Sequence, residues 1–163
     1  MQFLIIPADL NDTDHASAII TLLDEYASTP EGGMSGLSNF VKENLIAELK
    51  KRSDCLIILA LHKNKPAGLL IGFEGFSTFS CKPLLNIHDI MVSKKYRGNQ
   101  LSQDLLVFTQ DIAKKRHYCK LTLEILEGNK IAKAAYQKFG FKGYELNPEM
   151  GKAVFWEKDL IDK

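Results

Sequence analysis

The sequence has few cysteines, no long apolar run and almost no net charge, and each feature excludes a class of protein. Its three cysteines, Cys55, Cys81 and Cys119, are odd in number and lie outside any Cys-x-x-Cys spacing, which predicts reduced thiols. The longest apolar run, residues 56–61, is far shorter than the ~18 residues of a membrane span. A net charge of +1 argues against a nucleic-acid-binding protein. Because the chain also starts without a basic segment or a cleavage site, we expect a cytoplasmic protein that binds neither nucleic acid nor membranes.

The rest of the composition is that of an ordinary globular domain. The 163 residues are 45% hydrophobic and 25% charged, which predicts one domain over residues 1–163 with a core that needs no disulfide or metal. The four histidines show no metal-ligand spacing, so we predict no metal site. Phosphate-loop, dinucleotide-binding and Gly-x-Ser-x-Gly nucleophile motifs are absent as well.

Charge is distributed unevenly along the chain. Residues 1–49 carry eight acidic residues and one basic residue, whereas residues 93–120 carry seven basic and two acidic residues. Two solvated faces of opposite sign are the usual cause of such a pattern. The alternative is a polyanionic ligand bound by the middle of the chain and a cationic ligand bound near its N-terminal part.

The hydrophobic pattern predicts the element order β-α-α-β-β-β-α-β-α-β-β and therefore an α/β (α+β) domain on a mixed sheet. Helices are expected after the cap residues 11–14, after Ser38, over 101–115 and over 130–139. Strands are expected over residues 2–7, 55–61, 67–76, 84–92 and 121–126, followed by a terminal pair over 141–146 and 153–158.

A polar loop joins the strand at 84–92 to the helix at 101–115. The first backbone N–H groups of that helix lack intrahelical acceptors and, with the helix dipole, attract anions. Gly98 allows a ligand to approach the backbone closely, and Arg97 can bind a phosphate through two hydrogen bonds. The alternative is a basic turn in which Asn99 is the N-cap.

A second segment favours the ligand. Asn129 follows a strand and opens a helix that contains Ala132 and Tyr136 and is closed by Gly140 and Phe141. The two segments together resemble the GNAT superfamily of acyl-CoA-dependent N-acetyltransferases. The loop resembles its V-x-x-x-x-R-G-x-G-x-G/A pattern, and the helix matches its N-x-x-A-x-x-x-Y-x-x-x-G-F pattern at every position. The resemblance covers essentially the whole chain and implies a mixed, mostly antiparallel sheet of about seven strands flanked by about four helices.

The resemblance implies transfer of an acetyl group from acetyl-CoA to a primary amine of a small molecule, by direct attack in a ternary complex without an acyl-enzyme. Open alternatives are transfer of another acyl group, transfer to a protein or peptide amine, and a non-catalytic CoA-binding module. A homodimer is also an open expectation. The residues that the resemblance implies for cofactor binding are Ile90, Met91, Val92, Arg97, Gly98, Asn99, Gln100, Leu101, Ser102, Asn129 and Tyr136.

The loop departs from the family pattern at two positions. Gln100 stands where the family has glycine, and Ser102 where it has glycine or alanine. Backbone amides remain available at both positions, so the departure bears on cofactor affinity more than on cofactor identity. The side chain of Gln100 either crowds the cofactor or donates an additional hydrogen bond to it.

The acceptor amine must lose a proton before it attacks, which requires a base or a desolvating pocket. Charged residues in otherwise apolar strands are the candidates for this role: His88, Asp89, Glu124 and Glu74. Each has a structural alternative, such as a hydrogen-bonded interior histidine or an acid paired with a buried base.

The resemblance implies that Tyr136 approaches the thioester sulfur, where its phenol can protonate the leaving CoA thiolate. The alternative is a tyrosine ring that only packs on the sheet. Glu74 and Phe76 are expected to contact the acceptor, in a pocket formed by residues 31–40 and 73–84. Together with the acidic balance of residues 1–49, the acids in the strands predict a cationic or amine-bearing acceptor.

Overall fold

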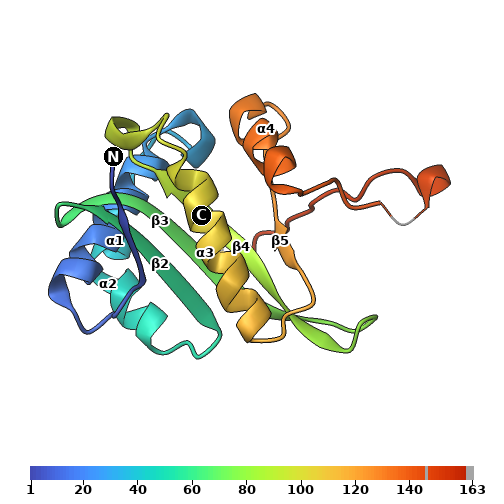
Figure 1. Ribbon diagram of the computed structural model, residues 1–163, viewed down its shortest axis with the longest axis horizontal. Coiled ribbons are helices and arrows are strands. Elements are labelled where there is room, and N and C mark those ends of the chain that lie inside the picture. The colour runs from blue at the N-terminus through green and yellow to red at the C-terminus, as the bar shows by residue number, and fades with distance from the viewer. Residues whose placement is uncertain (146, 161–163) are drawn as a thin grey trace. The chain divides into compact units, whose positions relative to one another are not determined.

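A computed structural model describes residues 1–145 and 147–160 of the chain (Figure 1). The chain divides into two compact units, Met1–Leu126 and Glu127–Lys163. The expectation of one domain over residues 1–163 therefore stays a prediction. Among the described residues, no helix combines the length and the apolar character that crossing a bilayer requires.

The larger unit contains a five-stranded sheet in the order β1-β2-β3-β4-β5. Strands β1 to β4 pair antiparallel in sequence order, and β5 pairs with β4 in parallel. The mixed, mostly antiparallel sheet is thus confirmed, although the described residues form five strands and not about seven. The strands are β1 (Leu4–Pro7), β2 (Cys55–His62), β3 (Lys65–Ser77), β4 (Lys82–Val92) and β5 (Leu121–Leu123).

Helices cover both faces of this sheet. Figure 1 shows α3 (Leu101–Lys115) in front of β2 to β4, with α1 (Thr13–Ala27) and α2 (Asn39–Lys50) behind the sheet. The Asp12 side chain caps α1 by accepting hydrogen bonds from the next turn, and the Ser38 hydroxyl caps α2 in the same way. All three helices begin where the sequence predicts them.

The core on the α1–α2 face is formed by every second residue of the central strands. Ile57, Leu69 and Met91 belong to one buried cluster with residues of α1 and α2. On the opposite face, a Cβ atom added at Gly68 would lie 3.1 Å from Leu105 Cδ1 and 3.2 Å from the Met91 carbonyl oxygen. The glycine therefore allows α3 to pack closely on β3.

The smaller unit contains α4 (Lys130–Phe139), which begins and ends as predicted. The Asn129 side chain accepts a hydrogen bond from the Ala132 N–H at 3.0 Å and caps the helix. Gly140 closes it with φ +109, a left-handed conformation that glycine adopts at little cost.

The predicted terminal strand pair is wrong for the residues that can be assessed. Residues 141–145 and 153–158 contain no strand, and Leu146 lies outside the described residues. One backbone hydrogen bond joins the two segments, from the Ala153 N–H to the Tyr144 carbonyl at 3.1 Å. Apolar and aromatic residues in both segments were not sufficient, because two short segments need further strands or a packed face to form a stable ribbon.

Candidate functional site

Strand β4 has a bulge at the point where its pairing with β5 ends. On the β3 side, Asp89 pairs with Ile71 and Ile87 pairs with Gly72, which leaves His88 as an extra residue. On the β5 side, the ladder stops at Ile87. The extra residue changes the alternation, so that His88 and Asp89, although adjacent, both line the same pocket.

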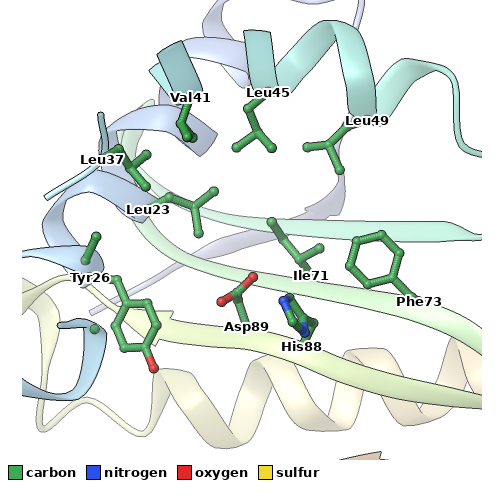
Figure 2. A pocket seen from close by; sticks show the side chains of 12 residues that line it. Leu23, Tyr26, Leu37, Val41, Leu45, Leu49, Ile71, Phe73, His88 and Asp89 are labelled. Atoms are coloured by element: carbon green, nitrogen blue, oxygen red, sulfur yellow. The ribbon is translucent and has the colours of Figure 1, made fainter. Parts of the chain in front are cut away.

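That pocket has a volume of about 370 Å³ and lies between the sheet and the α1–α2 side (Figure 2). Its polar side chains are Tyr26 of α1 and the His88–Asp89 pair of β4. Figure 2 shows Val41, Leu45 and the other α2 side chains on one side of the pocket and the polar pair of β4 on the other. The apolar lining consists of Leu23, Ala27, Leu37, Val41, Leu45, Leu49, Ile71 and Phe73, and Gly32 completes it.

Burial alters the titration of the polar side chains in this pocket. It raises the pKa of Asp89 above its ordinary value, while the charge of His88 opposes the shift. Burial also raises the pKa of Tyr26, and the charges of Asp89 and Glu31 add to that effect. The Tyr26 hydroxyl therefore keeps its proton at neutral pH and can donate a hydrogen bond. A cation beside Asp89 would stabilise its carboxylate, which makes this end of the pocket suitable for an ammonium group.

Beyond the bulge, β4 has a free edge on its β5 side. The Ser93 N–H donates to the Ala67 carbonyl on the β3 side at 3.0 Å. Because successive N–H groups of a strand point in opposite directions, Met91 directs its N–H toward β3, and Ile90 and Val92 direct theirs away. No described strand pairs with β4 on that side after Ile87. An extended ligand can therefore bind this edge through backbone hydrogen bonds.

The loop after β4 presents several backbone N–H groups. Within the described ranges, the N–H groups of residues 98–102 have no intramolecular acceptor. The N-cap of α3 is Gln100, so the alternative that placed Asn99 there is wrong. Asn99 instead uses its side-chain amide to bind the Tyr96 and Arg97 carbonyls at 3.0 and 3.1 Å. These bonds hold the loop in shape without using the backbone N–H groups of residues 98–102, which are therefore suited to bind an anion.

Two residues of the loop have left-handed backbone conformations. Gly98 has φ +78 and Gln100 has φ +60. A glycine adopts this region without steric cost, whereas the Cβ atom of glutamine is crowded there. The conformation of Gln100 thus gives a physical reason why the family pattern has glycine at this position.

Arg97 has a defined position in the loop. Its Nε donates to the Val92 carbonyl oxygen at 3.2 Å, which ties the base of the side chain to the end of β4. Hydrogen bonds from its own backbone and from Thr29 lower the pKa of Glu31, and the charge of Arg97 adds a smaller effect in the same direction.

Other predicted residues of the larger unit lie outside the pocket. Glu124 follows β5 and accepts a hydrogen bond at 3.4 Å from Asn86 of β4. Glu74 accepts a hydrogen bond from the Tyr118 hydroxyl. Neither Glu74 nor Phe76 lines the pocket. The roles of Glu124 in proton transfer and of Glu74 and Phe76 in acceptor binding stay predictions.

The motif of the smaller unit forms a helix that is closed at both ends. The Tyr136 ring contacts the Phe141 ring edge to face, with centroids 5.9 Å apart. The Phe141 N–H donates to the Tyr136 carbonyl at 3.0 Å. With the Asn129 cap and the Gly140 closure, these contacts give a structural reason for the motif residues Asn129, Tyr136, Gly140 and Phe141. The predicted cofactor contacts of Asn129 and Tyr136 stay predictions.

Sequence reasoning did not identify most of the pocket. Of the two segments expected to form it, residues 31–40 supply Gly32 and Leu37, and residues 73–84 supply Phe73. The remaining apolar lining comes largely from α1 and α2, where leucines at helical spacing indicate only core. A usable signal was present in the adjacent polar residues His88 and Asp89, which break the two-residue alternation of a strand and are typical of a bulge.

Comparisons with known proteins identify the family and the fold. The sequence model described as Acetyltransferase (GNAT) family matches residues 19–141. No curated protein matches the sequence.

Three solved structures illustrate the shared fold. A probable acetyltransferase has 19% identity and a TM-score of 0.77, with 100% of both chains covered. An aminoglycoside acetyltransferase from an uncultured soil metagenomic sample, in complex with sisomicin, has 18% identity and a TM-score of 0.79, with 97% of this chain and 96% of that chain covered. A ribosomal-protein-alanine N-acetyltransferase from Brucella melitensis biovar Abortus 2308 has 17% identity and a TM-score of 0.72, with 99% of this chain and 100% of that chain covered. The TM-scores show that the fold is shared. Because the family match extends over more than half of the sequence, the chain belongs to the GNAT family of acetyltransferases.

Proposed function

We propose that this protein transfers an acetyl group from acetyl-CoA to the primary amine of a small molecule. One observation carries the proposal: three features suited to this reaction follow one another along β4 and the loop after it. They are the polar pair His88–Asp89 in the pocket, the free strand edge after Ile87, and the amide-rich loop 97–102.

The free edge and the loop fit the two parts of an acyl-CoA. The loop amides, the positive end of the α3 dipole and the Arg97 guanidinium are all suited to bind the pyrophosphate. The N–H groups of Ile90 and Val92 face the open side of β4 and can pair with the amides of the pantetheine arm, as an added strand would. The same arrangement would bring the thioester to the bulge.

The pocket fits the acceptor. Asp89 holds the ammonium group and takes its proton, because a carboxylate with a raised pKa is a better base near neutral pH than an ordinary one. His88, beside it and exposed to solvent, passes the proton to water. Tyr26 donates a hydrogen bond at the same end of the pocket.

The transfer needs no covalent enzyme intermediate. The lone pair of the neutral amine attacks the thioester carbonyl carbon, and the C–N bond forms while a backbone N–H of the β4 edge stabilises the developing oxyanion. The tetrahedral species then collapses, the C–S bond breaks, and sulfur leaves with the electron pair. The family pattern favours Tyr136 as the proton donor to sulfur. The former amine nitrogen carries one extra proton after the attack and releases it to solvent, from which Tyr136 is reprotonated, so the products are an acetamide and CoA thiol.

The pocket favours a small acceptor over a protein segment. Its volume of about 370 Å³ is near the lower end of the ~300–1,000 Å³ typical of small-molecule sites. The similar solved structures include, by name, an enzyme for aminoglycosides and an enzyme for a ribosomal-protein alanine, so the fold alone does not select either class.

Calorimetry with acetyl-CoA tests the donor site. We expect micromolar binding by the parent protein and a loss of about 1.5–3 kcal/mol in Arg97→Ala, which is roughly 10- to 150-fold in Kd. Arg116→Ala is the matched control, because this arginine stands just after the opposite end of α3. Absence of binding by the parent protein, or equal losses in both variants, would contradict the proposed site.

A further inference from the structure

The pocket is apolar except at one end, and from this we infer that the acceptor is a monoamine whose single ammonium group is attached to a branched or aromatic hydrocarbon. The inference rests on the proposed function, because it names the acceptor of the same reaction. It is narrower than the expectation drawn from charge alone, which was any cationic or amine-bearing acceptor.

The walls of the pocket are apolar and only partly covered by the protein. Leu37, Val41 and Leu45 line the pocket and are only half-buried in the protein. A hydrocarbon body would remove this apolar surface from water. A second ammonium group or a row of sugar hydroxyls would lose hydration against the same walls without gaining a partner.

The polar end of the pocket has a single carboxylate among the described residues. Asp89 is the sole acid that lines the pocket among the described residues, and Tyr26 and His88 are the other polar side chains there. One carboxylate pairs with one ammonium group. The pocket therefore has a place for one positive charge, at the end that adjoins the free edge of β4.

Several acidic residues of residues 1–49 bind other parts of the protein and are therefore not available to an acceptor in the pocket. Asp24 accepts the Leu37 N–H at 2.8 Å and binds Lys42 Nζ at 2.8 Å. Glu25 accepts the Lys94 N–H at 2.7 Å. None of the eight acids in residues 1–49 lines the pocket. The carboxylates of Asp24 and Glu25 thus connect α1 to residues before and within α2 and to the loop after β4. Since no acid of residues 1–49 lines the pocket, this region does not form a site for a polycation there.

A matched panel of amines tests the inference. 2-Phenylethylamine and 3-methylbutylamine are compared with 1,4-diaminobutane, spermidine and sisomicin, by the release of CoA thiol and by calorimetry of each amine with the CoA-bound protein. We expect kcat/KM for the two hydrocarbon amines to exceed that of the others by about 100-fold, since the latter bury charge or hydroxyls without partners.

Two threonine variants locate the binding surface. Val41→Thr keeps the volume of a pocket wall but adds a hydroxyl, and we expect about a 10-fold loss in kcat/KM for 2-phenylethylamine with unchanged acetyl-CoA affinity. Val107→Thr makes the same change on α3 at a residue that is 47% exposed and outside the pocket, and it should behave as the parent.

The outcomes separate the two proposals. Preference for the diamine, spermidine or sisomicin overturns the inference, and so do equal effects of the two threonine variants. Binding of the hydrocarbon amines without any thiol release supports the ligand class and contradicts the transferase. Failure of acetyl-CoA to bind contradicts the proposed function directly.

Discussion

Replacing Gln100 with glycine tests how the loop before α3 is held. Gln100 has φ +60, a left-handed conformation that costs a residue with a Cβ atom roughly 1–2 kcal/mol. Glycine removes that strain but gives the unfolded chain about 0.4–1 kcal/mol more conformational entropy. Gln100→Gly should therefore raise the free energy of unfolding by up to ~1.6 kcal/mol, with each kcal/mol worth about 2–4 °C in Tm for a domain of this size.

His117 provides a matched control for this substitution. It has φ +58 and lies just beyond the opposite end of α3, so His117→Gly should give a similar gain in Tm. Only the Gln100 variant should change acetyl-CoA binding, and we expect Kd to fall several-fold because a bare backbone lets the pyrophosphate approach more closely.

Scanning calorimetry and titration calorimetry measure the two effects. A Gln100→Gly protein that is less stable than the parent, while His117→Gly is more stable, would refute the assigned strain. Equal acetyl-CoA affinity in both variants would refute the role of the loop in binding the cofactor.

Three other substitutions test different parts of the structure. Gly68→Ala places a Cβ atom 3.1 Å from Leu105 Cδ1, so we expect denaturant unfolding to show a loss of about 1–3 kcal/mol, and no loss would mean that α3 shifts freely. Asp89→Asn should raise Tm at pH 7, because burial raises the pKa of this carboxyl and its negative charge therefore destabilises the folded state. The gain in Tm should vanish as the pH falls toward the ordinary pKa of 3.8, where the carboxyl is protonated. The same variant should lower kcat by at least ~100-fold. Tyr136→Phe should lower kcat by at least ~100-fold with Tm and acetyl-CoA affinity nearly unchanged, and a normal kcat would assign the proton to water.

The helices and most strands could be predicted because their signals are local. Asp12, Ser38 and Asn129 are caps whose side chains bind the first turn of their helices, and Gly140 takes the left-handed conformation that ends α4. Such features depend on a few neighbouring residues, so the sequence carries them in full. The loop and the α4 motif were recognisable for the same reason.

The pocket could not be predicted because it depends on contacts between distant elements. Leu45 and Leu49 at helical spacing indicate a buried face, but they do not tell which part of that face stays uncovered. The bulge at His88 is set by the register between β3 and β4, and it decides that Asp89 enters the pocket. The terminal strand pair was predicted wrongly because the apolar residues of the two segments lack the partners that a ribbon needs.

Acetyl transfer measured at both products tests the account most directly. Protein, acetyl-CoA and 2-phenylethylamine are incubated, CoA thiol is quantified by a colorimetric reagent, and the acetamide is quantified by mass spectrometry. The proposed acetyltransferase activity predicts one thiol per acetamide, with both products lost when the amine is omitted. Tight acetyl-CoA binding without thiol release for any amine would contradict it and would identify a CoA-binding module without transferase activity.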